Sequence, residues 1–343
     1  MKRLLFILTI TITLTAQQRR IVRAGGAEAD EMTKDWPKVS GTGIEAIEAN
    51  LAELVKRDLF SGTVLVAREG KPMFFQSYGA GNNNDTTYNI GSINKIFTMV
   101  ALRQLRQQGK IDFTKTLRTY LPDYPSKIAD EITIQQLLDH SSGMGDIFGP
   151  RFAAAHDKLR TLQDYVPLFA DQPLEFEPGT RRRYSNAGYV VLGLVIEKLS
   201  GMSYYDYVRE KIYKPAGMKN SDSYALSDDV PNRATGMHKE GDARKANHEL
   251  LPARGSSAGG GYATAMDLLR FTQALPTLLS RNDFLEMVGD HPGIGWGGGA
   301  PGVNAVVELE GPYTIIVLSN YDPPAAQYVG RQARQALGIA LDE

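Results

Sequence analysis

A serine and a lysine three residues apart, Ser92 and Lys95, form a pair that could carry out acyl transfer. They open a run from Ile93 to Leu105 that is apolar on most sides of a 3.6-residue period, as in a buried helix. Residues three apart share one face of a helix, and its first turn presents unpaired N–H groups and a positive dipole end. Serine is a weak nucleophile at neutral pH, so a lysine whose charge is disfavoured could serve as its base.

The same spacing also has an ordinary structural interpretation. Ser-x-x-Lys occurs by chance in long chains, and a serine that caps a helix needs no catalytic role. The functional interpretation therefore depends on further motifs toward the C-terminus of the chain.

Tyr184 and Asn186 lie in a predicted loop just before an apolar helix over residues 189–199. A tyrosine with a pKa of about 10 is a poor base unless nearby cations lower that pKa. Lys95 and the arginines at 181–183 could supply such cations. Alternatively, Tyr184 is a half-buried aromatic residue and the arginines form a solvated surface.

A third segment, Gly293 to Gly302, is rich in glycine and precedes a predicted strand. Glycines there would let a substrate lie close to the strand edge. The N–H of Gly299 could then stabilise an oxyanion together with the N–H of Ser92. Considered alone, the segment is an ordinary loop.

In chain order, the motifs Ser92-x-x-Lys95, Tyr184-Ser-Asn186 and Trp296-Gly-Gly298 resemble those of the serine β-lactamase and penicillin-binding-protein superfamily. The branch most similar is the class C β-lactamase-like group of esterases and D-peptidases. The likeness runs from about Ser61 to Asp322. It includes three phrases outside the motifs: residues 137–143, 215–218 and 259–265.

The resemblance implies a role for each matched residue. Ser92 would be the nucleophile, with Lys95 and Tyr184 as its proton partners. Asn186 would contact the substrate or Lys95, and the N–H groups of Ser92 and Gly299 would form the oxyanion hole, with Gly298 closing the third motif. His140 falls in one of the shared phrases, where the family uses it structurally.

Trp296 departs from the family pattern, which has Lys or His at this position and commonly Thr where this chain has Gly297. Tryptophan removes a cation that would bind a substrate carboxylate. We therefore expect a preference for uncharged or aromatic-flanked acyl groups, unless one of the arginines at 181–183 reaches into the cleft.

Three functions remain open at this point. The first is a serine hydrolase that forms an acyl-enzyme on Ser92 and hydrolyses an ester or amide. The second is a class C-type β-lactamase. The third is a catalytically silent module that binds a peptide or cell-wall fragment.

Composition and charge limit the kinds of molecule that this chain is expected to bind. The chain has 343 residues, a net charge of −1 and no cysteine. The balanced charge gives no basic surface for nucleic acid, so a small ester, amide or peptide substrate is expected. The histidines are scattered and cysteine is absent, so we expect no metal and no cofactor. The sequence does not indicate an oligomeric state.

The pattern of elements predicts an α/β (α+β) fold. Predicted hairpins at 61–78 and 302–318 would form one antiparallel sheet from the N- and C-terminal segments, flanked by helices at 44–55 and 325–337. The predicted sheet domain comprises residues 44–116 and 255–343, and an all-helical domain, 117–254, is inserted between them.

The N-terminal residues suggest export. Residues 1–16 have the layout of a secretory signal, with Lys2 and Arg3 before an uncharged stretch, and residues 17–43 read as a linker or lightly packed arm. The uncharged stretch is too short for a membrane span. We therefore expect a periplasmic or extracellular protein without a membrane span in its mature chain.

Overall fold

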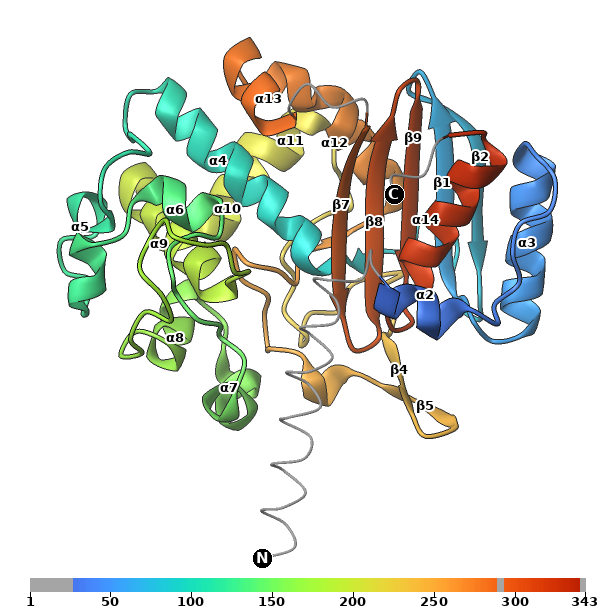
Figure 1. Cartoon of the computed structure of the whole chain (residues 1–343), viewed down its shortest axis with the longest axis horizontal. Helices are drawn as coiled ribbons and strands as arrows, with labels where there is room; N and C mark the ends of the chain where they lie inside the picture. Colours follow the sequence, from blue (N-terminus) through green and yellow to red (C-terminus); the bar gives the residue numbers. More distant parts are fainter. Residues whose placement is uncertain (1–26, 289–292, 340–343) are drawn as a thin grey trace, which may run out of the picture.

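A computed structural model describes residues 27–288 and 293–339 (Figure 1). Its centre is a five-stranded antiparallel sheet with the strand order β2-β1-β9-β8-β7. The strands are β1 (Gly62–Arg68), β2 (Lys71–Tyr78), β7 (Gly293–Ala300), β8 (Val303–Glu310) and β9 (Tyr313–Ser319). Because β1 pairs with β9, the two ends of the chain meet in the middle of the sheet, as predicted.

Helices cover both faces of this sheet. α3 (Ile44–Lys56) and α14 (Ala325–Ala336) pack on one face, and α12 (Ala265–Leu278) packs on the other. The side chains of β1 alternate between the two layers, since Val64 and Val66 join the core under α14 whereas Leu65 and Ala67 join the larger core. The predicted mixed α and β architecture with an antiparallel sheet is therefore confirmed.

The helices between the sheet segments form the other half of the molecule (Figure 1). α4 (Lys95–Gln107) and α9 (Asn186–Ser200) pack against each other at its centre, and both are almost wholly buried along their contact. The surrounding helices are α5 (Leu117–Tyr120), α6 (Ile134–Leu138), α7 (Pro150–Ala155), α8 (Leu162–Tyr165), α10 (Tyr204–Val208), α11 (Lys214–Ala216) and α13 (Arg281–Val288).

Three strand pairings of the structure were not predicted from the sequence. The glycine-rich segment expected to be a loop is the edge strand β7, held by its ladder to β8. The segment predicted to be all-helical contains the hairpin β4 (Met237–Glu240) and β5 (Ala243–Ala246). In addition, β3 (Tyr88–Asn89) pairs with β6 (Tyr262–Ala263) beside the start of α4. In each case the pairing partner, rather than local propensity, determines the strand.

The N-terminal arm packs more closely than a linker would. Residues 27–43 include α2 (Ala27–Thr33), and Trp36 packs edge-on against Tyr328 of α14. The backbone N–H of Val39 donates to the side chain of Gln332 at 2.6 Å. The predicted signal segment, residues 1–16, lies outside the described residues. Within the described ranges, no helix combines the length and the apolar character that crossing a bilayer requires.

Candidate active site

Ser92 lies in a 3₁₀ turn, η1 (Gly91–Asn94), rather than at the N-cap of an α-helix. α4 begins directly after this turn at Lys95, so the helix and turn are continuous. Gly91 has a φ of +52°, and a side chain there would meet the backbone of β7. Only glycine therefore lets the turn approach β7 closely enough to place Ser92 beside that strand.

Tyr184 and Lys95 both approach the hydroxyl of Ser92. The phenol of Tyr184 donates to Ser92 Oγ at 2.7 Å, and Lys95 Nζ lies 3.4 Å from the same oxygen. Burial raises the pKa of Tyr184 above its usual value, in contrast to the expected lowering by nearby cations. The phenol is therefore protonated at neutral pH and acts as a hydrogen-bond donor to Ser92.

Lys95 is buried, and its burial lowers its pKa to about 7. Its ammonium group also lies over the ring of Tyr184, 4.6 Å from the centroid. Lys95 Nζ donates to Asn186 Oδ1 at 2.7 Å and, by a short contact, to the carbonyl of Ala258. A substantial neutral fraction at pH 7 makes Lys95 the stronger candidate for the base.

Asn186 is held in place from two directions. It is the first residue of α9, whose N-cap, Ser185, accepts from the N–H of Gly188 at 3.0 Å. Its Nδ2 group donates to both carboxylate oxygens of Asp146, at 3.0 and 3.1 Å. Sequence reasoning missed Asp146, since a lone aspartate after Gly143-Met-Gly gives no signal of proximity to Lys95.

The β7 strand brings Gly298 and Gly299 to the nucleophile. A side chain on Gly298 would lie 2.9 Å from the backbone nitrogen of Ser92, and one on Gly91 would lie 2.7 Å from that of Gly299. The two N–H groups assigned to an oxyanion hole thus stand on adjoining backbones. Asn304 supports the strand by donating to the carbonyl of Gly298 at 3.1 Å.

A cleft of about 860 Å³, open to solvent, lies over Ser92. Ser92, Tyr184, Asn186 and Gly299 all line it. The rest of the wall is largely apolar, and its larger side chains include Ile147, Phe148, Phe152, Tyr165, Tyr224, Leu226, Leu250, Leu251 and Pro252.

The structure does not bring Trp296 into this cleft. Its side chain is partly buried against the main core and is absent from the cleft wall. The arginines at 181–183 are exposed and also stay out of the wall: Arg183 pairs with Glu175 at 2.5 Å, and Arg181 lies over the ring of Phe176. Apolar side chains, rather than Trp296, therefore line the cleft over Ser92.

His140 stacks on the ring of Tyr184, with centroids 4.5 Å apart, and its Nδ1 accepts from the N–H of Ser185 at 3.2 Å. Burial lowers its pKa to about 3, so the ring is neutral across the physiological range. These contacts fit a structural role. In the part of the chain that the structure describes, no group of three or more acidic or histidine side chains could hold a metal ion.

The family described as Beta-lactamase matches residues 45–338. The chain is 30% identical to a protein named as penicillin-binding protein PbpX from Bacillus subtilis, over 71% of this chain and 63% of that protein. It is 26% identical to a β-lactamase from Providencia stuartii, over 67% of this chain and 59% of that protein. The alignment thus spans about three fifths of each curated relative.

Solved structures agree with this assignment. A penicillin-binding protein from Bacillus halodurans superposes with a TM-score of 0.76 at 30% identity, over 84% of this chain and 98% of that one. The resemblance drawn from the three motifs is therefore confirmed at the level of the family. Together with proteins named as a β-lactamase and as penicillin-binding proteins among its relatives, the match over residues 45–338 shows that the chain belongs to the Beta-lactamase family.

Proposed function

We propose that this protein is a serine hydrolase that forms an acyl-enzyme on Ser92 and cleaves uncharged esters or amides with an apolar acyl group. The observation that carries the proposal is the pair of contacts at Ser92 Oγ, from Tyr184 at 2.7 Å and Lys95 at 3.4 Å. A lysine with a pKa of about 7 is a competent base near neutral pH.

In the acylation step, neutral Lys95 takes the hydroxyl proton of Ser92 as Oγ bonds to the carbonyl carbon. The carbonyl oxygen becomes an oxyanion facing the N–H groups of Ser92 and Gly299. When the carbonyl re-forms, the bond to the leaving oxygen or nitrogen breaks. The leaving group takes a proton from Tyr184, which regains one from protonated Lys95.

Deacylation repeats these steps with water. Water attacks the acyl carbon and gives its proton to Lys95, and Ser92 then leaves with a proton returned through Tyr184. The products are a carboxylic acid and the original enzyme. Every proton is thus transferred between Ser92, Tyr184, Lys95 and the reactants, so the reaction as written needs no cofactor.

The cleft wall supports the choice of substrate. Its apolar side chains favour an uncharged acyl group, and no arginine or lysine is among the residues that line it in the described part of the chain. A penicillin or cephalosporin carries a carboxylate that would normally be bound by charge-assisted hydrogen bonds. The β-lactamase alternative is therefore less favoured than an esterase or amidase.

Intact-mass analysis after a pulse of p-nitrophenyl ester or a fluorophosphonate tests the proposal. One adduct per chain is expected, absent from Ser92→Ala. An adduct that persists in Ser92→Ala would refute the assignment of Ser92 as the nucleophile. Absence of both labelling and ester turnover would instead favour the silent binding module.

A further inference from the structure

Lys95 can act as a base only if its lone pair points at Ser92. A neutral amine has two N–H bonds and one lone pair. Besides Ser92, Nζ contacts two acceptors, namely Asn186 Oδ1 at 2.7 Å and the carbonyl of Ala258. When each takes one N–H, the lone pair is left for the hydroxyl proton of Ser92, 3.4 Å away.

This arrangement depends on the orientation of the Asn186 amide. If the amide turned by 180°, its Nδ2 group would face Lys95 and donate into the lone pair. The base would then be blocked without any change in the shape of the cleft. Something must therefore hold Oδ1, and not Nδ2, toward Lys95.

Asp146 meets this requirement. An ionised carboxylate only accepts hydrogen bonds, so it accommodates the Nδ2 side of the amide and rejects the Oδ1 side. Both of its oxygens lie within 3.1 Å of Asn186 Nδ2. Asp146 Oδ1 is itself fixed by the N–H of Ile147 at 2.7 Å.

We propose that Asp146 is a positioning residue which, by fixing the amide of Asn186, keeps the lone pair of Lys95 directed at Ser92. The inference rests on the proposed function, because it assigns Lys95 as the base. It concerns a residue that does not line the cleft and reaches Lys95 through the amide of Asn186.

The titratable groups around Lys95 determine how the acylation rate should depend on pH. The titratable groups that face it are Asp146, Tyr184, Tyr189 and His140. Burial keeps both phenols protonated, and it keeps His140 uncharged, through the neutral range. Asp146 is thus the acidic neighbour of Lys95. Burial raises the pKa of its carboxyl group, whereas the hydrogen bond from Asn186 and the charge of Lys95 act to lower that pKa. In its ionised form Asp146 raises the pKa of Lys95.

The test is the pH profile of Ser92 acylation by a p-nitrophenyl ester in Asp146→Asn. Asparagine can donate to Asn186 Oδ1 and so permits the blocked orientation. We expect a fall of about tenfold or more in the plateau rate, equivalent to one lost hydrogen bond to a charged group. Loss of the negative charge should also move the acidic limb of the profile to lower pH.

Two further variants separate positioning from folding. In Asn186→Ala, adding Asp146→Asn should cause little further loss, since both act through one amide. In the exchanged variant, Asp146→Asn with Asn186→Asp, residue 186 can only accept, so the plateau rate should recover above that of Asp146→Asn alone. Its acidic limb should lie at higher pH, because a carboxylate now touches Lys95.

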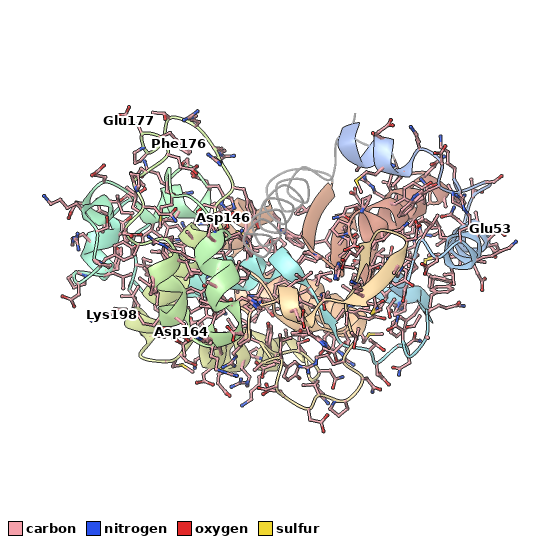
Figure 2. All side chains as sticks on the ribbon, turned by 90° about the horizontal axis from the view of Figure 1, so that it is seen from below. Glu53, Asp146, Asp164, Phe176, Glu177 and Lys198 are labelled. Carbon is pink, nitrogen blue, oxygen red and sulfur yellow. The ribbon has the colours of Figure 1, made fainter. Side chains whose placement is uncertain are left out.

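Asp164→Asn is the matched control. Asp164 is a second carboxylate of the helical half, but it caps α8 and lies apart from Asp146 (Figure 2). This control should acylate at the wild-type rate.

A wild-type rate and profile in Asp146→Asn would overturn the inference, as would independent losses in the Asn186→Ala background. An exchanged variant no faster than Asp146→Asn would also count against it. Failure of wild-type protein to be labelled at Ser92 would instead refute the proposed function, so the two failures are distinguishable.

Discussion

The hydroxyl of Tyr184 donates a hydrogen bond to Oγ of Ser92 at 2.7 Å, although the two residues are 92 positions apart. This contact makes Tyr184 a hydrogen-bond donor to Ser92. In the proposed mechanism Lys95, with its lowered pKa, is then the group that accepts the first proton.

Acylation should therefore depend on pH through Lys95. Its pKa of about 7 predicts a rate that rises about tenfold per pH unit below pH 7 and levels off above it. The burst of p-nitrophenol measured between pH 5.5 and 9 checks this prediction. Because Lys95 and Tyr184 share protons, the apparent pKa describes the pair. A flat profile would exclude Lys95 as the base.

Lys95 and Tyr184 should also behave as one unit. We expect Lys95→Ala and Tyr184→Phe each to lower the acylation rate by about 10² to 10⁴, the usual contribution of general acid–base catalysis. The double variant should be little worse than either single variant. Multiplicative losses in single-turnover measurements would show that one of the two only shapes the site.

The buried lysine should reduce stability in a pH-dependent way. The folded pKa of about 7 lies below the usual value of 10.5, so between these values the unfolded chain binds the extra proton. Stability then rises with pH across this window. Lys95→Met removes this pH dependence. The free energy of unfolding of the variant minus that of wild type should therefore fall by roughly 2 to 4 kcal/mol between pH 7 and pH 10. Urea unfolding measures both free energies at each pH, and a constant difference between variant and wild type from pH 7 to pH 10 would contradict this expectation.

The close approach of β7 to the 3₁₀ turn predicts opposite outcomes for neighbouring glycines. A methyl group on Gly298 would lie 2.0 Å from the carbonyl oxygen of Ile90, which forces the backbones apart. Gly298→Ala should lower acylation by at least about tenfold, because the N–H of Gly299 moves away. In Gly297→Ala the nearest atom is 3.9 Å away, so its activity should stay close to wild type. Equal activities of Gly298→Ala and Gly297→Ala in ester assays would show that the close approach of β7 to the 3₁₀ turn is not needed for acylation.

Substrate choice should follow the apolar wall of the cleft. We expect kcat/KM for p-nitrophenyl butyrate to exceed that for penicillins and cephalosporins by roughly tenfold or more, a gap of about 1.4 kcal/mol. Leu250→Arg places a cation in the wall and should narrow the gap, whereas Leu250→Gln should not. Equal turnover of a cephalosporin and the ester by wild type would restore the β-lactamase alternative.

The sequence predicted the elements whose signal is local. The amphipathic pattern of 44–55 and the two apolar segments joined by a turn in 61–78 are local signals, and the structure has α3 and the β1–β2 hairpin there. β7 was read as a loop because glycine has no side chain to reveal a strand. Its hydrogen bonds to β8, the next strand in the chain, determine its conformation, and the composition of β7 alone does not reveal them.

In the site, the sequence predicted the residues that belong to the three motifs. The motifs selected Ser92, Lys95, Tyr184 and Asn186, and the structure brings them together. The structure packs Trp296 against the main core and leaves it out of the cleft lining, since position in a motif does not fix which way an edge-strand side chain packs. Asp146 was missed since its proximity to Asn186 arises only when the loop after α6 folds over α9.

The pairing of β1 with β9 has a consequence for biosynthesis. Residues 62–68 find their central partner only when residues 313–319 have left the ribosome. Contacts of such long sequence separation form late. If Ser92 is the nucleophile and Gly299 supplies the second N–H of the oxyanion hole, as proposed, a nascent chain carries its nucleophile long before β7 can complete the site. We therefore expect hydrolytic activity only after β7 and β9 have left the ribosome.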